Sequence, residues 1–291
     1  MPYLIGTIGC LLFVFIVYMV VETYRLRVVD HTFFTNSAQN TTGNTAGKEA
    51  VFLHFTDLHL GRTGISNKNM VDVVCNEASD FLVFTGDYFE RYKQISLFLS
   101  LITEIRKVYS KPIYLCFGNH DHKDVFNKNP GSFNLVVKSL ETSGVTILEN
   151  SSADYVGVKG TISLRIIGLS DCRSNKADIK AVIREGSMGV QPGMPKLLIT
   201  HNSDILMKME KGSVDFAVAG HTHGGQIRTP FNVEVKLLHR KDILSSRKGI
   251  VRGYHRYNDI DLFISCGIGC VFLPIRFVSR PEIAKIKVRW I

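Results

Sequence analysis

The sequence predicts an α/β domain that follows an N-terminal membrane-spanning helix. Three observations lead to this fold class. The first is an apolar segment of 19 residues without a charge, Tyr3–Val21. The second is a series of short runs rich in Val, Ile, Leu and Phe, which are typical of strands buried on both faces. The third is the set of helix-like stretches between these runs, because alternating strands and helices characterise an α/β architecture.

The N-terminal segment is long enough to cross a bilayer. As a helix it would reach about 28 Å, close to the thickness of the hydrocarbon core. A signal peptide would carry a basic region, a shorter apolar stretch and a small-residue cleavage site, and the sequence has none of these. Residues 1–21 are therefore expected to form a single-pass anchor in the cell membrane. Arg25 and Arg27 follow the segment, and these two positive charges favour a cytoplasmic location for the rest of the chain. Two charges do not decide on which side of the membrane the domain lies.

Residues 22–50 are expected to form a flexible tether. Within them, Asn36–Lys48 is polar, rich in Gly, Thr and Asn, and free of apolar periodicity. No internal repeat or second linker follows. Residues 51–291 are thus expected to form one domain, and the oligomeric state is left open.

Five apolar runs in this domain are expected to be strands, at residues 51–55, 81–84, 112–116, 196–200 and 215–219. The stretches near residues 66–78, 93–108, 132–143 and 177–185 are expected to be helices. Each of the five runs ends in a cluster of polar side chains. Because ligands of α/β folds collect at the carboxyl ends of strands, these clusters mark the expected site.

Composition narrows the class of protein. The chain is 45% hydrophobic and 21% charged, so it can bury a sizeable core. A net charge of +9 favours an anionic partner such as a phosphate, a nucleic acid or a lipid surface. The cysteines are irregularly spaced, and five of the six lie outside the apolar segment. A disulfide framework is therefore not expected.

The strand ends together offer carboxylate, imidazole and amide side chains: Asp57, His59, Asp87, Asn119, His120, Asp121, His201, His221 and His223. This mixture suits manganese, iron, zinc, cobalt or nickel, whereas magnesium prefers oxygen ligands. One catalytic ion needs about three protein ligands. The larger set predicts two divalent ions, with manganese as the first choice. Such pairs lie ~3.5–4 Å apart, support in-line displacement at phosphorus, and lower the pKa of water so that hydroxide is available.

Two pairs of ligands share the same spacing. Asp57 and His59, like His221 and His223, are separated by one residue, so both side chains of a pair can point the same way from an extended strand end. The glycines at positions 220, 224 and 225 let the backbone turn and approach the ions closely.

The motifs DLH, GD, GNHD, a lone His201 and GHTH occur in an order that resembles the calcineurin-like metallophosphoesterases. GHTHGGQIRTP and the late SCGIG, LPIRF and RPEI segments are similar to a membrane-associated bacterial branch of that superfamily. The resemblance covers nearly the whole chain from residue 51. It implies a layered fold, with a two-sheet β sandwich flanked by helices.

The resemblance also implies roles for the site residues. Asp57, His59 and His223 would hold one ion, Asn119, His201 and His221 the other, and Asp87 would bridge them. His120 would protonate the leaving oxygen, helped by its acidic neighbour Asp121.

The implied reaction is hydrolysis of a phosphodiester or pyrophosphate by metal-activated hydroxide. GDYFERY departs from the GDxVDRG form of the Ser/Thr protein phosphatases, and GNHD has Asp where they have Glu. A nucleotide-linked acylated sugar such as UDP-diacylglucosamine is the favoured substrate. The alternatives are a phosphodiesterase of soluble or cyclic nucleotides, a nuclease, and a non-enzymatic metal-binding membrane scaffold.

The last predictions concern substrate and membrane contacts. Residues 228–256 hold eight Lys or Arg, which form either a rim that attracts phosphorylated substrate or anionic lipid or a solvated loop. No aromatic stacking platform accompanies them, so nucleic acid is not the expected partner. Arg228 and Arg276 are expected to contact substrate, although Arg276 could instead brace its loop through Glu282. The apolar stretch LFISCGIGCVFLPIRF is interpreted as a core strand with a packed loop, or as a lip for acyl chains.

Overall fold

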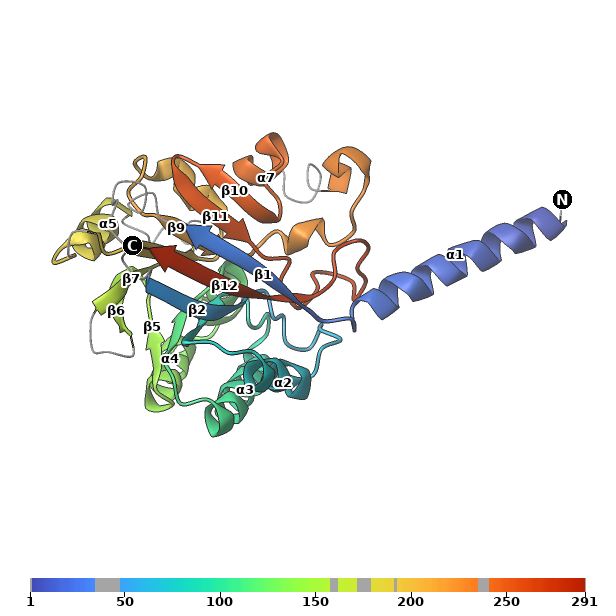
Figure 1. Ribbon diagram of the computed structural model, residues 1–291. Coiled ribbons are helices and arrows are strands. Elements are labelled where there is room, and N and C mark those ends of the chain that lie inside the picture. The colour runs from blue at the N-terminus through green and yellow to red at the C-terminus, as the bar shows by residue number, and fades with distance from the viewer. Residues whose placement is uncertain are drawn as a thin grey trace.

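The computed structural model of the protein describes residues 2–34, 48–157, 162–171, 179–190, 193–234 and 241–290. Over these residues the chain forms two six-stranded sheets that lie face to face, with helices on both outer faces (Figure 1). The fold is thus the helix-flanked two-sheet architecture that the resemblance implied.

The first sheet has the strand order β1-β12-β2-β3-β4-β5. Strands β2 to β5 run parallel to one another, and β12 joins β2 in the antiparallel direction. The strands are β1 (Arg27–Phe34), β12 (Glu282–Trp290), β2 (Lys48–Phe55), β3 (Phe81–Thr85), β4 (Ile113–Cys116) and β5 (Val145–Ile147).

The second sheet has the order β10-β11-β9-β8-β7-β6, with a parallel centre formed by β11, β9, β8 and β7. Its strands are β10 (Gly253–Tyr257), β11 (Ile260–Ile264), β9 (Phe216–Ala219), β8 (Lys196–Thr200), β7 (Ile162–Leu169) and β6 (Ser151–Val156). The five apolar runs of the sequence correspond to β2, β3, β4, β8 and β9.

Three buried clusters hold the layers together. The middle cluster combines side chains of both sheets, such as Phe52, Phe81, Leu197 and Phe216. An outer cluster packs the first sheet against α2 (Asn67–Asn76), α3 (Ile95–Val108) and α4 (Ser132–Thr142). The other outer cluster packs the second sheet against α5 (Ile179–Ser187). The short α7 (Ile243–Lys248) contacts the turn of helix at Ser203–Lys208. Each predicted helix is therefore present within a few residues.

The N-terminal helix α1 (Pro2–Glu22) extends away from the domain (Figure 1). Among the helices of the described residues, α1 is the one that is long and apolar enough to cross a membrane. Most of its side chains are exposed. It is a candidate membrane anchor.

The segment after α1 differs from the expected tether. Residues 27–34 form β1, which pairs in parallel with β12 from Arg27↔Glu282 to Phe34↔Arg289. The physical reason lies in the inward side chains, since Phe33 is buried against Phe216 of the second sheet at a ring distance of 5.0 Å. The remainder of the expected tether, residues 35–47, lies outside the described residues.

Candidate metal centre

The predicted ligands come together where the parallel strands end. The loops after β2, β3 and β4 in the first sheet and after β8 and β9 in the second meet at one edge of the sandwich. Six predicted ligands form two buried groups whose ligand atoms lie within 4.8 Å of one another: Asp57, His59 and His223 in one group, and Asp87, His201 and His221 in the other.

In the first group, two imidazole rings point at each other. The Nε2 atoms of His59 and His223 are 3.2 Å apart, and the His223 Nε2 lies 3.3 Å from Asp57 Oδ1. The opposite ring nitrogens have acceptors: His59 Nδ1 lies 3.1 Å from Glu90 Oε1, and His223 Nδ1 lies 3.3 Å from the carbonyl of Gly269.

The second group repeats this arrangement. His201 Nε2 lies 3.2 Å from His221 Nδ1 and 3.1 Å from Asp87 Oδ2. The opposite nitrogens again face acceptors, since His201 Nδ1 donates to the carbonyl of Thr85 at 2.8 Å and His221 Nε2 lies 3.1 Å from Asp242 Oδ2.

These contacts show that each pair of facing imidazole nitrogens needs a positive charge between them. An outer nitrogen that donates to a carbonyl or carboxylate leaves a lone pair on the inner nitrogen of a neutral ring. Two such nitrogens facing each other at 3.2 Å require a proton or a cation between them. Without ions, burial alone would lower the pKa of His201, but the Asp87 carboxylate raises it to about 10. Protons and divalent ions therefore compete for the same positions, and the donor set fits two divalent ions.

Asp87 and Asn119 complete this picture. Asp87 Oδ2 lies 3.1 Å from His201 and 3.8 Å from His59, so the carboxylate reaches both groups. The Oδ1 of Asn119 is buried without a hydrogen-bond partner in the described part of the chain, and Asn119 lines the same cavity as Asp87 and His221. A free amide oxygen at this place is suited to a cation.

The backbone of the ligand loops is strained. Five of the candidate ligands have left-handed φ angles between 40° and 74°: Asp57, His59, Asp87, His221 and His223. Such conformations cost on the order of 1–3 kcal/mol each and are typical of functional sites. The glycines behave as the sequence suggested. A Cβ on Gly220 would lie 2.2 Å from Asp57 Oδ2, and Gly224 has a φ of 59°.

His120 has a different acidic partner from the expected one. Its Nδ1 lies 2.6 Å from Asp124, one turn along a short π-helix at Asp121–Phe126. The Asp121 carboxylate is instead buried and accepts four backbone N–H groups, from residues 87, 88, 89 and 118. These bonds hold the Asp87 loop against the Gly118 loop, so Asp121 shapes the centre rather than pairing with His120.

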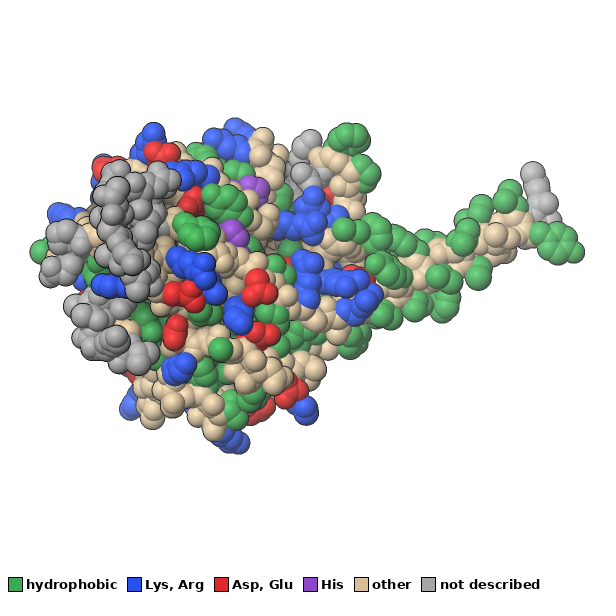
Figure 2. All heavy atoms as spheres, viewed as in Figure 1, with side chains coloured by type: hydrophobic (Ala, Val, Ile, Leu, Met, Phe, Trp, Pro, Cys, Tyr) green, Lys and Arg blue, Asp and Glu red, His purple; other side chains and the backbone are tan. Residues whose placement is uncertain are grey.

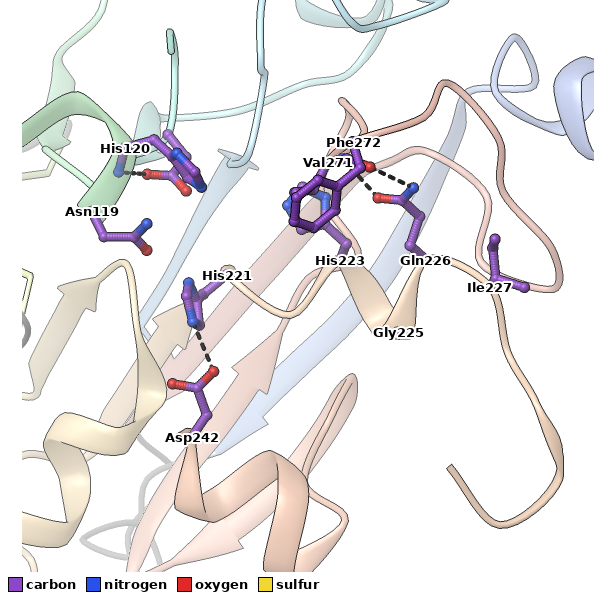
Figure 3. Close-up of a pocket in the computed structure, with 11 residues that line it drawn as sticks. Asn119, His120, His221, His223, Gly225, Gln226, Ile227, Asp242, Val271 and Phe272 are labelled. Carbon is purple, nitrogen blue, oxygen red and sulfur yellow. Dashed lines mark hydrogen bonds and ion pairs between the residues drawn. The ribbon is translucent and has the colours of Figure 1, made fainter. Parts of the chain in front are cut away.

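A cavity of about 230 Å³ opens above the centre (Figure 3). Asn119 and His120 lie on one wall and His221 on another, while Gln226, Val271 and Phe272 border the other side. The cavity therefore joins a polar floor of candidate ligands to an apolar edge.

The two arginines expected at the substrate do not line this cavity in the described part of the chain. Arg276 is completely buried and donates to the backbone carbonyls of residues 266, 267, 269 and 279. It thus braces its loop through these carbonyls, whereas Glu282 accepts from Arg27 and from the Cys266 N–H. Arg228 is partly exposed, with its Nε 4.0 Å from Glu234. Its contact with substrate stays a prediction.

Sequence reasoning missed three acidic residues that hold the histidines. Asp124 lies four residues after His120, a spacing that could have revealed it. Glu90 lies three residues after Asp87 and accepts from both His59 and Arg62. Asp242 had no local signal, because it reaches His221 from the start of α7, 21 residues away.

A two-sheet core that carries paired Asp and His groups at its strand ends defines a metal-dependent phosphoesterase. The match to a family model agrees with this class. The chain belongs to the calcineurin-like phosphoesterase family, whose model matches residues 50–225. It is therefore a hydrolase of phosphoric esters, and the family implies a dinuclear metal centre.

Similarity to known proteins extends over most of the chain. The uncharacterized metallophosphoesterase YkoQ of Bacillus subtilis is 28% identical over 252 residues, covering 86% of this chain and 87% of that protein. The phosphodiesterase YaeI of Escherichia coli is 24% identical, covering 84% and 83%. The UDP-2,3-diacylglucosamine pyrophosphatase LpxG of Chlamydia trachomatis is 24% identical, covering 81% and 82%.

Proposed function

We propose that the protein is a membrane-anchored, manganese-dependent hydrolase that cleaves a phosphodiester or pyrophosphate bond. The observation that carries this proposal is the pair of facing imidazole groups with Asp87 between them. One ion would be held by Asp57, His59 and His223, and the other by Asn119, His201 and His221, with Asp87 shared. When bound, such ions supply hydroxide and positive charge at the phosphorus.

His120 would act as the general acid. Asp124 accepts from its Nδ1 and so fixes the ring, which leaves Nε2 for the leaving oxygen. The His120 side chain is one quarter exposed, lines the cavity, and lies 5.3 Å from the His59 ring. Transfer of its proton would neutralise the departing oxygen, a contribution of ~10²–10⁴-fold in comparable enzymes.

The substrate we propose is a nucleotide-linked acylated sugar, UDP-diacylglucosamine. Three observations support it: the apolar edge at Val271 and Phe272, the candidate anchor α1, and the similarity to a pyrophosphatase named for that substrate. Addition of water across the pyrophosphate would release UMP and diacylglucosamine 1-phosphate.

The test uses full-length protein in detergent with Mn²⁺. Four substrates are compared: UDP-diacylglucosamine, bis-p-nitrophenyl phosphate, a cyclic nucleotide and an oligonucleotide. We expect the acylated sugar nucleotide to give the highest kcat/KM, with UMP identified by mass spectrometry. Asp87→Asn should abolish turnover. Asp72→Asn, which changes an exposed carboxylate on α2 paired with Lys68, should leave it intact.

Other outcomes select other functions. Faster cleavage of the cyclic nucleotide or the oligonucleotide would favour a soluble phosphodiesterase or a nuclease. Absence of turnover with Mn²⁺, Fe²⁺, Zn²⁺, Co²⁺ and Ni²⁺ would reject the proposed hydrolase and favour a metal-binding scaffold.

A further inference from the structure

The last turns of α1 pack against the loop between β11 and β12. The carbonyl of Met19 accepts from the N–H of Arg276 at 3.0 Å. The ring of Phe277 lies 5.1 Å from Phe15 and 6.1 Å from Tyr18, in edge contacts. The contacts with the domain therefore begin well before the end of the apolar helix.

Charged side chains and β1 secure the end of α1 further. Glu22 is 1% exposed and binds Arg280 at 3.1 Å and Arg25 at 3.2 Å. The chain then turns and enters β1 at Arg27, whose guanidinium binds Glu282 at 2.7 Å. With these contacts and the β1–β12 pairing, the base of α1 is fixed to the domain.

This geometry sets the depth of the domain in a membrane. Phe15 lies six residues before Val21, the last residue of the uncharged segment, which is about 9 Å along the helix axis. A bilayer that covers the whole apolar segment therefore also covers Phe277 on the neighbouring loop. A domain on a flexible tether would not be held at a fixed depth by the insertion of α1.

Exposed apolar side chains lie on the loop that carries Phe277 and on the segment that begins at Ile227, which pairs with Phe277. We call them the apolar rim: Phe231, Phe272, Leu273 and Val278, which are 87%, 74%, 61% and 52% exposed. Figure 2 shows hydrophobic side chains where α1 leaves the domain, with Lys and Arg side chains beside them. Arg252 donates to the carbonyl of Val278, so a basic side chain contacts the backbone beside the rim. Basic side chains at an apolar boundary are suited to lipid headgroups.

The rim is joined to the metal centre by Gln226, three residues after His223. Its Nε2 donates to the carbonyls of Val271 and Leu273 at 3.0 and 3.1 Å, and its Oε1 accepts from the Val271 N–H at 2.7 Å (Figure 3). Phe272 belongs both to the rim and to the cavity lining. The cavity therefore opens at the level of the rim.

From this geometry we infer that the apolar rim inserts into the same bilayer leaflet as the base of α1. The substrate is then an amphiphile whose phosphoester lies at headgroup level, while its acyl chains stay in that leaflet. This inference rests on the proposed anchor and hydrolase, and adds a direct lipid contact of the catalytic domain.

The rim is tested by fluorescence quenching in the full-length protein. Tryptophan is introduced as Phe231→Trp, Phe272→Trp and, as a control, Leu135→Trp, which is 50% exposed on α4. Trp290 is the natural tryptophan and is 3% exposed, so it gives a constant background. The proteins are reconstituted into phosphatidylcholine–phosphatidylglycerol vesicles with brominated acyl chains.

We expect the bromines to quench the rim tryptophans at least twofold and to leave the Leu135→Trp signal at the wild-type value. Equal quenching at positions 231, 272 and 135 in protein that resists alkaline extraction from the vesicles would overturn the inference. This readout needs no activity, so it is independent of the proposed reaction.

A double variant, Phe231→Ser with Leu273→Ser, tests the consequence for substrate. Hydrolysis of UDP-diacylglucosamine in vesicles should fall at least fivefold, while hydrolysis of bis-p-nitrophenyl phosphate should stay unchanged. An equal fall for both substrates would contradict a membrane role for the rim. Loss of every activity in the wild type would reject the hydrolase instead, and quenching would still decide on the rim.

Discussion

Replacement of Asp242 tests whether the contacts around the histidines serve metal binding. The Asp242 carboxylate lies 3.1 Å from His221 Nε2 and accepts from Asn202 at 3.2 Å. It therefore holds the His221 ring with Nδ1 directed toward His201. Asp242→Asn keeps the size of the side chain and removes its charge, and Asp242→Ala removes the acceptor as well.

Two independent considerations give the size of the effect. Loss of a partner that orients a metal-binding histidine typically lowers metal affinity 10–100-fold, about 1.4–2.7 kcal/mol. A hydrogen bond to a charged group contributes about 1.5–3 kcal/mol, which is the same range. We expect Asp242→Asn to weaken binding of one Mn²⁺ about tenfold and Asp242→Ala to weaken it about 100-fold.

The assay is calorimetric titration of metal-free, full-length protein with Mn²⁺, checked by the metal content after dialysis. The ion held by Asp57, His59 and His223 should keep its affinity within about threefold, because the Asp242 carboxylate contacts His221 of the second group. Unchanged affinity for both ions in Asp242→Ala would refute the reasoning, since His221 would then need no oriented partner.

Three further predictions follow from the site and its surroundings. Asp124→Asn should slow esters with alkyl leaving groups about tenfold more than nitrophenyl esters, because only the former depend strongly on protonation by His120. Gly220→Ala should abolish metal retention, measured by elemental analysis, since the new Cβ would lie 2.2 Å from Asp57 Oδ2. Burial lowers the pKa of His54 to about 3. Between pH 6.5 and pH 3 this histidine is therefore protonated in the unfolded chain but neutral in the folded one. Its contribution to the free energy of unfolding is complete above pH 6.5 and is lost on acidification, by about 2 kcal/mol at pH 5. Urea denaturation at pH 7 and pH 5 should show this loss in the wild type and a smaller one in His54→Gln.

Controls separate these effects from general damage. Asp72→Asn should not change the leaving-group dependence. Gly212→Ala, at a φ of 63° with open space around the new Cβ, should strain the backbone without a steric clash and should retain metal. If His54→Gln loses as much stability on acidification as the wild type, the protonation of this residue does not control the acid sensitivity of the fold.

The ligand loops could be predicted because their signals are local. Asp57, Asp87 and His201 follow apolar runs within three residues, and parallel strands end at a common edge. The pairing of β1 with β12 had no local signal, because the two strands lie 255 residues apart and β1 contains Asp30 and His31 in a stretch that follows an apolar span.

Side-chain partners were harder to predict than ligands. Asp121 adjoins His120 in sequence, but the backbone turns its carboxylate toward four N–H groups and gives Asp124 the contact with the ring. Arg276 has the residue type of a phosphate ligand, yet its loop folds around the guanidinium. The path of the backbone determines which partner such a side chain contacts, and the spacing of residues in the sequence does not reveal that path.

The pairing of β1 with β12 also constrains how the protein is made. β1 leaves the ribosome early, whereas its partner strand follows 255 residues later. At ~5–20 residues per second, this delay lasts on the order of 10–50 s. During that time the sheet edge that β12 later covers is open, and an open strand edge can pair with other chains.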